Sequence, residues 1–406
     1  MKFVLGLLIV YLFFPYLGLF NYDGFGGRVT NEMKILYILH IFIELSIIMF
    51  FLFILYRSNF ISINSNNYIY KYNVKKVIKK SIILLIIAIF INFFIFGNYK
   101  ILFGIMGRGE FRTTLHLGFI YNFLSFFFPG AILTLNTHLY SRLPLFLRKK
   151  FKMKIIILFI LAMMLGFLTG FKSTAIFIAI MGLIGLSPIL NIKHIILTSI
   201  IFIFIMAISG YLFMHFENFN QVFFYLLKRA TSIAVDGTVG VYNNFPDGAK
   251  DSYLILLYIF GNKLASFITG WQVNSLEYLQ IDLGRHIAYL TYPSKLTDEA
   301  LSGAFNLTIT NFGEAIYLFG KNYFYIYSLL IGLIISLIFF LYIKGDIKLK
   351  VVLSVYFITS VVIGGGRITN IFAVTTFIYL LGVYLIITFI LNTSLNKEYK
   401  YVSKNN

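Results

Sequence analysis

Residues 323–343, YFYIYSLLIGLIISLIFFLYI, form an uninterrupted apolar run without a charged side chain. An α-helix rises about 1.5 Å per residue, so a run of this length reaches across the roughly 30 Å hydrocarbon core of a bilayer. The rest of the chain is similar, because apolar residues make up 59% of its 406 residues and charged residues only 12%. Average soluble domains carry about 25% charged residues. The composition therefore predicts an all-α integral membrane protein.

Further apolar runs bring the prediction to about ten transmembrane helices. The predicted spans are 3–20, 35–56, 81–98, 117–136, 153–170, 173–190, 195–215, 323–343, 350–366 and 371–391. The first run lacks the small-residue cleavage site of a signal peptide, so we expect it to remain as a helix. Three parts of the chain follow: 1–215 with spans one to seven, a large polar loop at 216–322, and 323–406 with spans eight to ten and a tail.

Lysine and arginine predict the orientation of these spans. Loops that alternate along the predicted topology, with the two termini, hold 20 of the 34 Lys and Arg but only Asp346 and Glu398 among the 15 acids. The opposite side holds 14 cations and 12 acids. Because cytoplasmic loops are enriched in Lys and Arg, both termini are predicted to be cytoplasmic and 216–322 to face outward. The net charge of +19 is then explained by orientation, and no nucleic acid partner is implied.

Cations on the predicted outer side need another explanation. One stretch, KRATSIAVDGTVG at 228–240, places Lys228 and Arg229 where the chain leaves the membrane. Other outward cations lie near the ends of spans, several beside glycine: Arg108, Arg112, Lys172, Arg285 and Arg367. Snorkelling or ordinary ion pairs with acids such as Glu110 and Asp236 would account for single members. As a set they favour an anion site at the membrane surface, since guanidinium groups hold phosphate through two parallel hydrogen bonds.

These features together resemble the Wzy-type O-antigen polymerases, which join oligosaccharide repeat units of bacterial surface polysaccharide. The resemblance lies in the ten or so spans, the single late outward loop, the turn GFKST at 170–174, and the run NLTITNFGEAIYLFG at 306–320. Arg229 is also separated by ten residues from Gly240, a spacing found in outward loops of some members. Where that family usually has Gly-Ser-Arg in the turn, this chain has Phe171 and Lys172.

The resemblance implies a GT-C-like polytopic glycosyltransferase in the bacterial inner membrane. Its donor and acceptor would be oligosaccharides on undecaprenyl diphosphate, with the lipid diphosphate as leaving group; membrane lipid and a chain-length regulator protein would be further partners. Cations near the outer interface would stabilise the charge that develops on the diphosphate. The predicted diphosphate-binding residues are Arg229 and Arg285, followed by Arg108, Arg112, Lys172 and Arg367.

The acceptor hydroxyl needs a group that takes its proton. The predicted catalytic residues are His286, Glu314 and Asp236, with Glu277 as a further outward candidate. No Asp-x-Asp pair occurs in the chain, so we expect a reaction without metal or other cofactor. The chain also contains no cysteine, which excludes a thiol nucleophile and Cys-ligated metal.

One ionisable pair is predicted inside the membrane. His40 and Glu44 are four residues apart, so they lie on one face of the second span. Such a pair is either a mutually satisfied contact between helices or a functional group of a transporter.

Three alternatives to the polymerase stay open. They are a ligase that uses the same donor chemistry, a flippase for lipid-linked oligosaccharides, and an acyltransferase in which His40 is catalytic.

Overall fold

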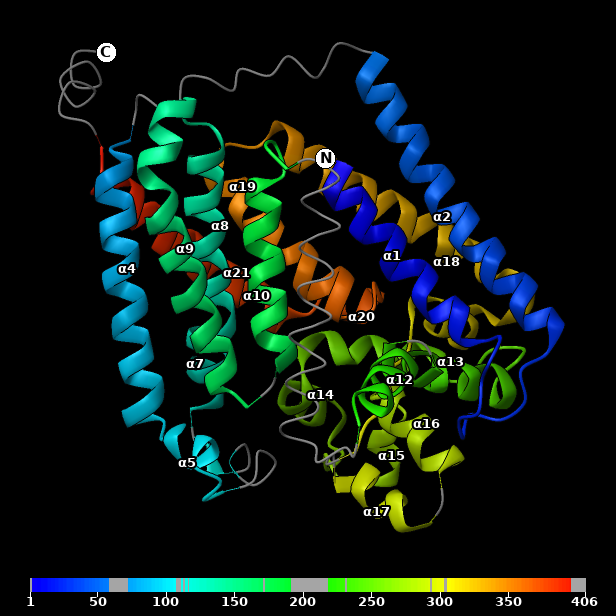
Figure 1. Cartoon of the computed structure of the whole chain (residues 1–406). Helices are drawn as coiled ribbons and strands as arrows, with labels where there is room; N and C mark the ends of the chain where they lie inside the picture. Colours follow the sequence, from blue (N-terminus) through cyan, green and yellow to red (C-terminus); the bar gives the residue numbers. More distant parts are fainter. Residues whose placement is uncertain are drawn as a thin grey trace.

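The computed structural model is helical throughout the part of the chain that it describes (Figure 1). The described residues are 2–57, 72–106, 111, 114–115, 117–170, 172–190, 218–230, 232–292, 294–302 and 305–395. Within these ranges there is no β-strand, and an isolated bridge pairs Tyr72 with Leu395.

Six helical segments in the described ranges are long and apolar enough to cross a membrane. They are Asn31–Leu55, Val74–Ile95, Gly118–Ser141, Leu145–Leu168, Asn311–Lys344 and Ile368–Asn392. The prediction of a multi-pass, all-α membrane protein is thereby confirmed at this level. The count of about ten stays a prediction. Two predicted spans match shorter apolar helices, Phe3–Gly18 and Ser173–Leu186, and the predicted span 350–366 falls in Ile347–Tyr356 and Phe357–Ile363, which are not among the six. The predicted span 195–215 lies outside the described residues.

The bundle contains the following helices, and some of them adjoin a wider π-helical turn. They are α1 (Lys2–Gly18), α2 (Asn31–Arg57), α4 (Val74–Phe90) with η1 (Ile91–Ile95), α5 (Tyr99–Leu102), α7 (Gly118–Asn122) with η2 (Phe123–Phe127), α8 (Phe128–Ser141), α9 (Leu145–Leu168), α10 (Lys172–Leu186), α18 (Asn311–Lys344), α19 (Ile347–Tyr356) with η4 (Phe357–Ile363), α20 (Ile368–Ile371) and α21 (Val374–Asn392).

Glycine allows the closest helix contacts in one half of the bundle. Helix α8 packs against α9, α10 and α19, and it is the most buried of the six candidate spans. A Cβ atom on Gly185 of α10 would lie 2.1 Å from Oγ1 of Thr137, and one on Gly166 of α9 would lie 2.5 Å from Cα of Ala175. Small residues let helices approach in lipid, where dispersion contacts replace the hydrophobic effect as the driving force. Helices α8, α9 and α10 therefore form a tightly packed unit.

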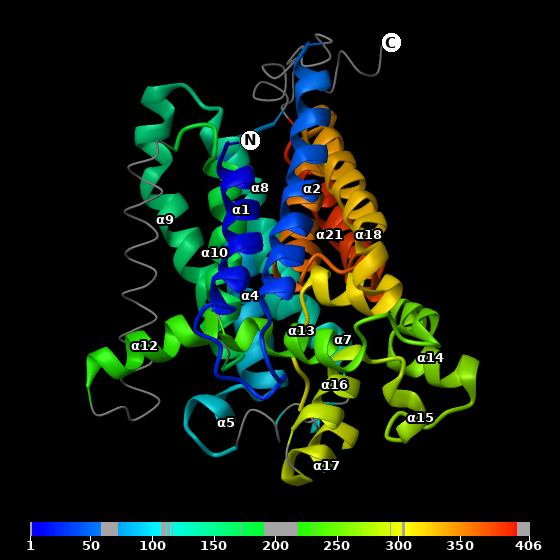
Figure 2. The same ribbon diagram turned by 90° about the vertical axis from the view of Figure 1, so that its right-hand side faces the viewer.

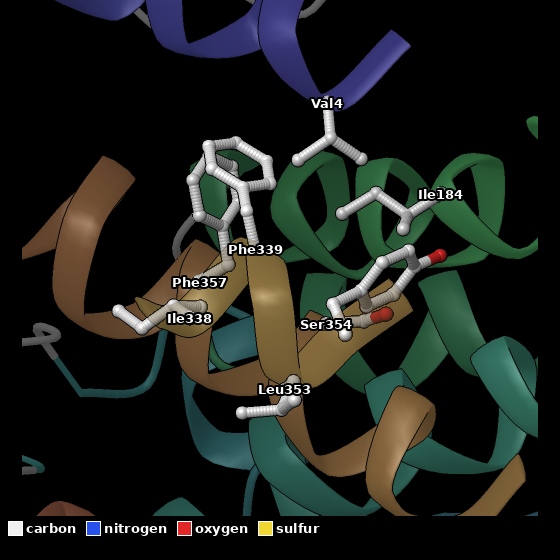
Figure 3. A pocket seen from close by; sticks show the side chains of 8 residues that line it. Val4, Ile184, Ile338, Phe339, Leu353, Ser354 and Phe357 are labelled. Atoms are coloured by element: carbon white, nitrogen blue, oxygen red, sulfur yellow. The ribbon is translucent and has the colours of Figure 1, made fainter. Parts of the chain in front are cut away.

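The interior leaves little free volume between these helices. Figure 3 shows a cavity of about 10 Å³ beneath α1, lined by apolar side chains such as Val4, Ile184 and Phe339. This volume is about that of a single water site. The cavity is thus a packing gap and offers no room for a substrate.

A layer of shorter helices covers one end of the bundle (Figure 2). Its members are α12 (Phe219–Ala230), α13 (Ser232–Asn244), η3 (Ser252–Phe260), α14 (Asn262–Thr269), α15 (Leu276–Leu279), α16 (Leu283–Thr291) and α17 (Ser294–Ser302). They belong to the loop predicted at 216–322, and we call them the outer layer. The apolar run 253–271 forms η3 and α14, joined at Gly261 with φ 78°, so each piece is too short to cross a bilayer.

Helix α18 begins inside the predicted loop and breaks once. Gly320 has φ 70° and ψ 172°, which separates a half-helix, residues 311–319, from the long remainder of α18. The turn at 246–248 fills the break, because Lys321 N donates to Pro246 O at 2.8 Å and a Cβ on Gly320 would lie 2.6 Å from the carbonyl carbon of Asp247. Only glycine combines this backbone conformation with so close an approach. The outer layer is thereby attached to the bundle.

The start of α1, the start of α4 and the end of α21 lie at the end of the bundle opposite the outer layer (Figure 1). Asn73 N donates to Ser394 O at 2.8 Å, which fastens α4 to α21 there. The basic connections between α8 and α9 and between α18 and α19 lie at the same end. The membrane side that each end faces stays a prediction.

Candidate functional site

A glycine-rich turn carries Arg367 at the end of the bundle that the outer layer covers. The π-helix η4 ends at Ile363, and Gly365 and Gly366 follow with φ 76° and 60°. A Cβ on Gly365 would lie 2.9 Å from Ile309 O, so the turn is pressed against the segment that precedes α18. Arg367 is half-buried at the start of α20, and Nε donates to Gly364 O at 3.5 Å.

Glu314 anchors this turn. Its carboxylate, fully buried in α18, accepts hydrogen bonds from Ile368 N at 2.6 Å, from Oγ1 of Thr369 at 2.6 Å and from the hydroxyl of Tyr327. Three donors satisfy the hydrogen-bonding capacity of a carboxylate well. Glu314 thus holds the residues directly after Arg367, which makes it a positioning residue in this geometry. Its role as a base stays a prediction.

Arg367 lies where the bundle meets the outer layer. Its charge acts on the Tyr327 hydroxyl in α18 and also on Asp282 and Tyr258 of the outer layer. No salt bridge joins it to an acid within the described residues. A half-buried guanidinium in this position keeps hydrogen-bond donors available for an anion.

A pocket opens beside the turn. It has a volume of about 290 Å³, near the lower end of the roughly 300–1,000 Å³ typical of small-molecule sites. Helices α7, α9, α10 and α21 and the π-helices η2 and η4 contribute its lining: Tyr121, Asn122, Ser125, Phe126, Phe127, Thr169, Ser173, Thr174, Phe177, Ile363 and Tyr379. Ile363, which is the last residue of η4, belongs to this lining and lies four residues before Arg367 in the chain.

The pocket combines aromatic faces with uncharged polar groups. Tyr379 stacks between Phe119 and Phe127, with ring centroids 4.3 Å apart on each side. Amide and hydroxyl groups of residues such as Asn122 and Thr174 complete the lining, and no described lining residue carries a formal charge. Aromatic faces with a few polar groups suit a neutral, hydroxyl-rich ligand such as a sugar. Sequence reasoning missed Asn122 and Tyr379, because a polar residue within an apolar span does not reveal which helix it faces.

Arg285, a predicted diphosphate ligand, is buried and bonded to the backbone of the outer layer. Nε donates to Ala300 O at 2.7 Å, one terminal nitrogen donates to Val273 O at 3.0 Å, and the same nitrogen contacts Leu301 O. Asp282 caps α16, the helix that contains Arg285. Burial raises the pKa of Asp282 above its usual range, although the charges of Arg285 and Arg367 oppose this shift. These contacts stabilise the outer layer, and they place Arg285 as a structural cation.

His286, the predicted base, lies next to Arg285 but in a different environment. Its ring packs on Phe245, with centroids 5.6 Å apart, and Nδ1 lies 3.4 Å from the Tyr317 hydroxyl. Burial lowers the pKa of His286 to about 4. The imidazole is therefore neutral near pH 7, as a general base must be.

Asp236 connects three segments of the outer end. It is buried in α13 and accepts from Gly26 N at 2.8 Å and from the hydroxyls of Tyr22 and Tyr292. Burial and the neighbouring carboxylate raise the pKa of both tyrosines. Neither tyrosine was predicted, since their positions before α2 and after α16 give no sequence signal that they meet.

The other predicted residues divide into two groups. Arg108, Arg112 and the side chains of Lys172 and Arg229 lie outside the described residues, as does Glu110. Glu277 is described and exposed in α15. The structure thus brings Arg367 and Glu314 together at one turn, and it places Arg285, His286 and Asp236 in the outer layer.

Comparison of the chain with protein-family models, with curated proteins and with solved structures finds no match. Among the described residues, no three His, Asp or Glu side chains gather as ligands of a metal ion would. The candidate site consequently has to be interpreted from its own geometry.

Proposed function

We propose that this protein is a membrane glycosyltransferase that polymerises oligosaccharide repeat units carried on a polyprenyl diphosphate, as the Wzy-type polymerases do. The observation that carries the proposal is the half-buried Arg367, four residues after Ile363, which lines a neutral, aromatic-walled pocket. A lipid-linked sugar diphosphate presents one anionic and one uncharged polar part. Arg367 and the pocket match these two parts.

In this proposal Arg367 stabilises the diphosphate as it leaves. Negative charge grows on the leaving group in the transition state, and a cation already in place gains interaction energy there without reorganising. Glu314 keeps the turn in position through its bonds to Ile368 and Thr369. The pocket holds the sugar by contacts with aromatic lining residues such as Phe126 and Phe177 and by hydrogen bonds to Asn122 and its neighbours.

Proton removal from the acceptor hydroxyl has one favoured candidate in the outer layer. His286 is neutral near pH 7 because burial lowers its pKa to about 4, and its other contacts are aromatic. The carboxylate of Asp236 already accepts three hydrogen bonds. We therefore place the base function on His286 and a positioning function on Asp236.

The test uses the purified protein in nanodiscs with a synthetic polyprenyl-diphosphate-linked repeat unit. We expect chains of two and more repeats, with release of polyprenyl diphosphate. Arg367→Ala should lower the turnover about 10²–10³-fold, the loss typical when one group that stabilises transition-state charge is removed. Arg367→Lys should retain part of the activity, since the charge remains without the planar fork. Lys263→Ala, at an exposed cation of α14, is the matched control and should leave turnover unchanged.

Deletion of the gene separates this activity from its alternatives. A surface polysaccharide with a single repeat unit supports the polymerase. Full-length chains retained on the lipid carrier would indicate a ligase, and absence of any exported repeat would indicate a flippase. Wild-type chain lengths with Arg367→Ala would contradict the assigned role of Arg367.

A further inference from the structure

The pair His40 and Glu44 lies buried where α2 packs along α18. Both side chains are fully inaccessible, and Nε2 of His40 lies 3.6 Å from Oε2 of Glu44. Asn311, the first residue of the half-helix, donates to the same Glu44 oxygen at 2.8 Å. The predicted placement of the pair on one helix face is confirmed, and α18 is the helix that it faces.

Three buried polar atoms at this place have no hydrogen-bond partner within the part of the chain that the structure describes. They are Nε2 of His40, Oε1 of Glu44 and the hydroxyl oxygen of Tyr11 in α1. A buried polar atom without a partner is destabilising, so such atoms rarely occur together by chance. The described residues do not supply the partners that these three atoms require.

The hydrogen bonds of Ser328 assign the histidine tautomer. Its hydroxyl has a single proton and donates it to Phe324 O at 3.2 Å. Nδ1 of His40, at 2.6 Å from the Ser328 oxygen, must then carry a proton and donate. In the neutral imidazole this leaves a lone pair on Nε2 that points toward Glu44. Two acceptors would face each other at 3.6 Å unless a further proton lies on one of them.

The charges around the pair lead to the same requirement. Glu314 and Glu44 are both fully buried, and the groups that face them are Tyr11 from α1, Tyr37 from α2, Tyr327 from α18 and Arg367 from the glycine-rich turn. Arg367 follows the turn that Glu314 anchors and offsets its charge. An ionised Glu44 with a neutral His40 would leave one uncompensated charge at membrane depth, which is strongly unfavourable.

We propose that His40 and Glu44 bind one proton between them, and that this proton holds the half-helix 311–319 against α2. With the proton, the pair is electrically neutral whichever atom carries it, and Glu44 can accept from Asn311. Without it, two acceptors repel at the base of the half-helix that also bears Glu314. The protonated pair is therefore a lock on the segment that positions the glycine-rich turn.

The test follows the pH dependence of stability and uses no substrate, so it is independent of the proposed glycosyl transfer. In the unfolded chain His and Glu have pKa values of about 6.5 and 4.3. Above pH 6.5 the unfolded chain holds no proton on this pair while the folded protein holds one. Stability therefore falls as pH rises, and the unfolding equilibrium constant in mixed detergent micelles should increase about tenfold per pH unit from pH 7 until the folded pair releases its proton, near pH 8.

Glu44→Gln removes the need for the proton, since the amide is uncharged at every pH and its oxygen still accepts from Asn311. We expect this variant to lose the tenfold dependence, whereas His138→Gln, at another buried histidine of the bundle, should keep it. If Glu44→Gln does not fold, the double variant His40→Leu, Glu44→Leu takes its place, because an apolar pair binds no proton. A flat profile in the wild type, or an unchanged slope in these variants, would overturn the proposal.

Discussion

The two halves of the bundle bury polar groups in different ways. In α8, Thr134 and Thr137 donate to carbonyl groups of their own helix at 2.7 and 2.8 Å. In α18, the Glu314 carboxylate instead accepts hydrogen bonds from Ile368 and Thr369 of α20 and from Tyr327, which lies beyond the break at Gly320. A bond within one helix needs no particular neighbour, whereas bonds between segments fix their relative positions. The first half also has bonds between segments, such as that from Asn136 of α8 to Oγ of Ser81 in α4 at 2.7 Å, but they join uncharged groups. We call the first half the scaffold, and the second half differs because its bonds between segments position charged groups.

The largest effect is expected where the second half loses its central acceptor. Glu314→Ala leaves three donors unpaired and removes a buried charge, which should cost about 3–5 kcal/mol of stability. Reversible unfolding in mixed micelles measures this loss. Glu32→Ala is the control, because the exposed Glu32 pairs with Lys321 at 3.3 Å near the surface, and its loss should destabilise the protein far less than the loss of Glu314. Equal losses of stability in the two variants would show that bonds to Glu314 do not hold the second half of the bundle together.

A smaller effect is expected from overpacking the scaffold. Gly185→Ala places a methyl group within 2.1 Å of Oγ1 of Thr137, so α10 must move away from α8. The expected loss is about 1–3 kcal/mol, measured in the same way. Gly6→Ala in α1 is the matched control, because a Cβ at Gly6 has open space around it. If Gly185→Ala is as stable as the control, the close contact between α8 and α10 does not hold the scaffold together.

A still smaller and pH-dependent effect is expected at His286. Burial lowers its pKa to about 4 in the folded protein, while the unfolded chain has a value of about 6.5. The stability that this neutral histidine contributes is present above pH 6.5 and is lost as pH falls toward 4. His286→Gln should therefore reduce the loss of thermal stability between pH 6.5 and 4. An acid profile identical to that of the wild type would show that the ring is not buried as described.

The variants expected to disturb the protein least test which side of the membrane each end of the bundle faces. The chain contains no cysteine, so a single introduced cysteine is a unique label. Asn274→Cys lies on the exposed surface of the outer layer, and Lys149→Cys lies at the exposed start of α9 at the opposite end. A membrane-impermeant maleimide added to intact cells should label the first and not the second. Labelling in the reverse order would contradict the predicted orientation.

The sequence predicted the apolar helices well but said little about how they meet. Runs of Ile, Leu and Phe are long enough to span a bilayer, and this local property survives in α2, α9 and α21. The pair His40 and Glu44 was predicted on one face because helical periodicity is also local. Such patterns depend only on residues close in the chain.

The candidate site could be predicted only in part, because it depends on contacts between distant segments. Arg367 was selected for its glycine neighbours, and Glu314 as a catalytic residue. That Glu314 bonds to the residues after Arg367 follows from α18 and α20 lying together, more than 50 residues apart in the chain. Arg285 illustrates the opposite case, since its carbonyl partners at 273, 300 and 301 give no signal in the sequence.

The break at Gly320 also has a consequence for how the protein is made. The turn at 246–248 that closes the break is synthesised more than 70 residues before it, and Ala249 N donates to Tyr317 O at 2.9 Å in the same place. The turn is therefore synthesised before the helix that it contacts. Helix α18 can take its final bent form only after the segment containing this turn has left the translocation machinery, so the assembly of this bundle has a required order.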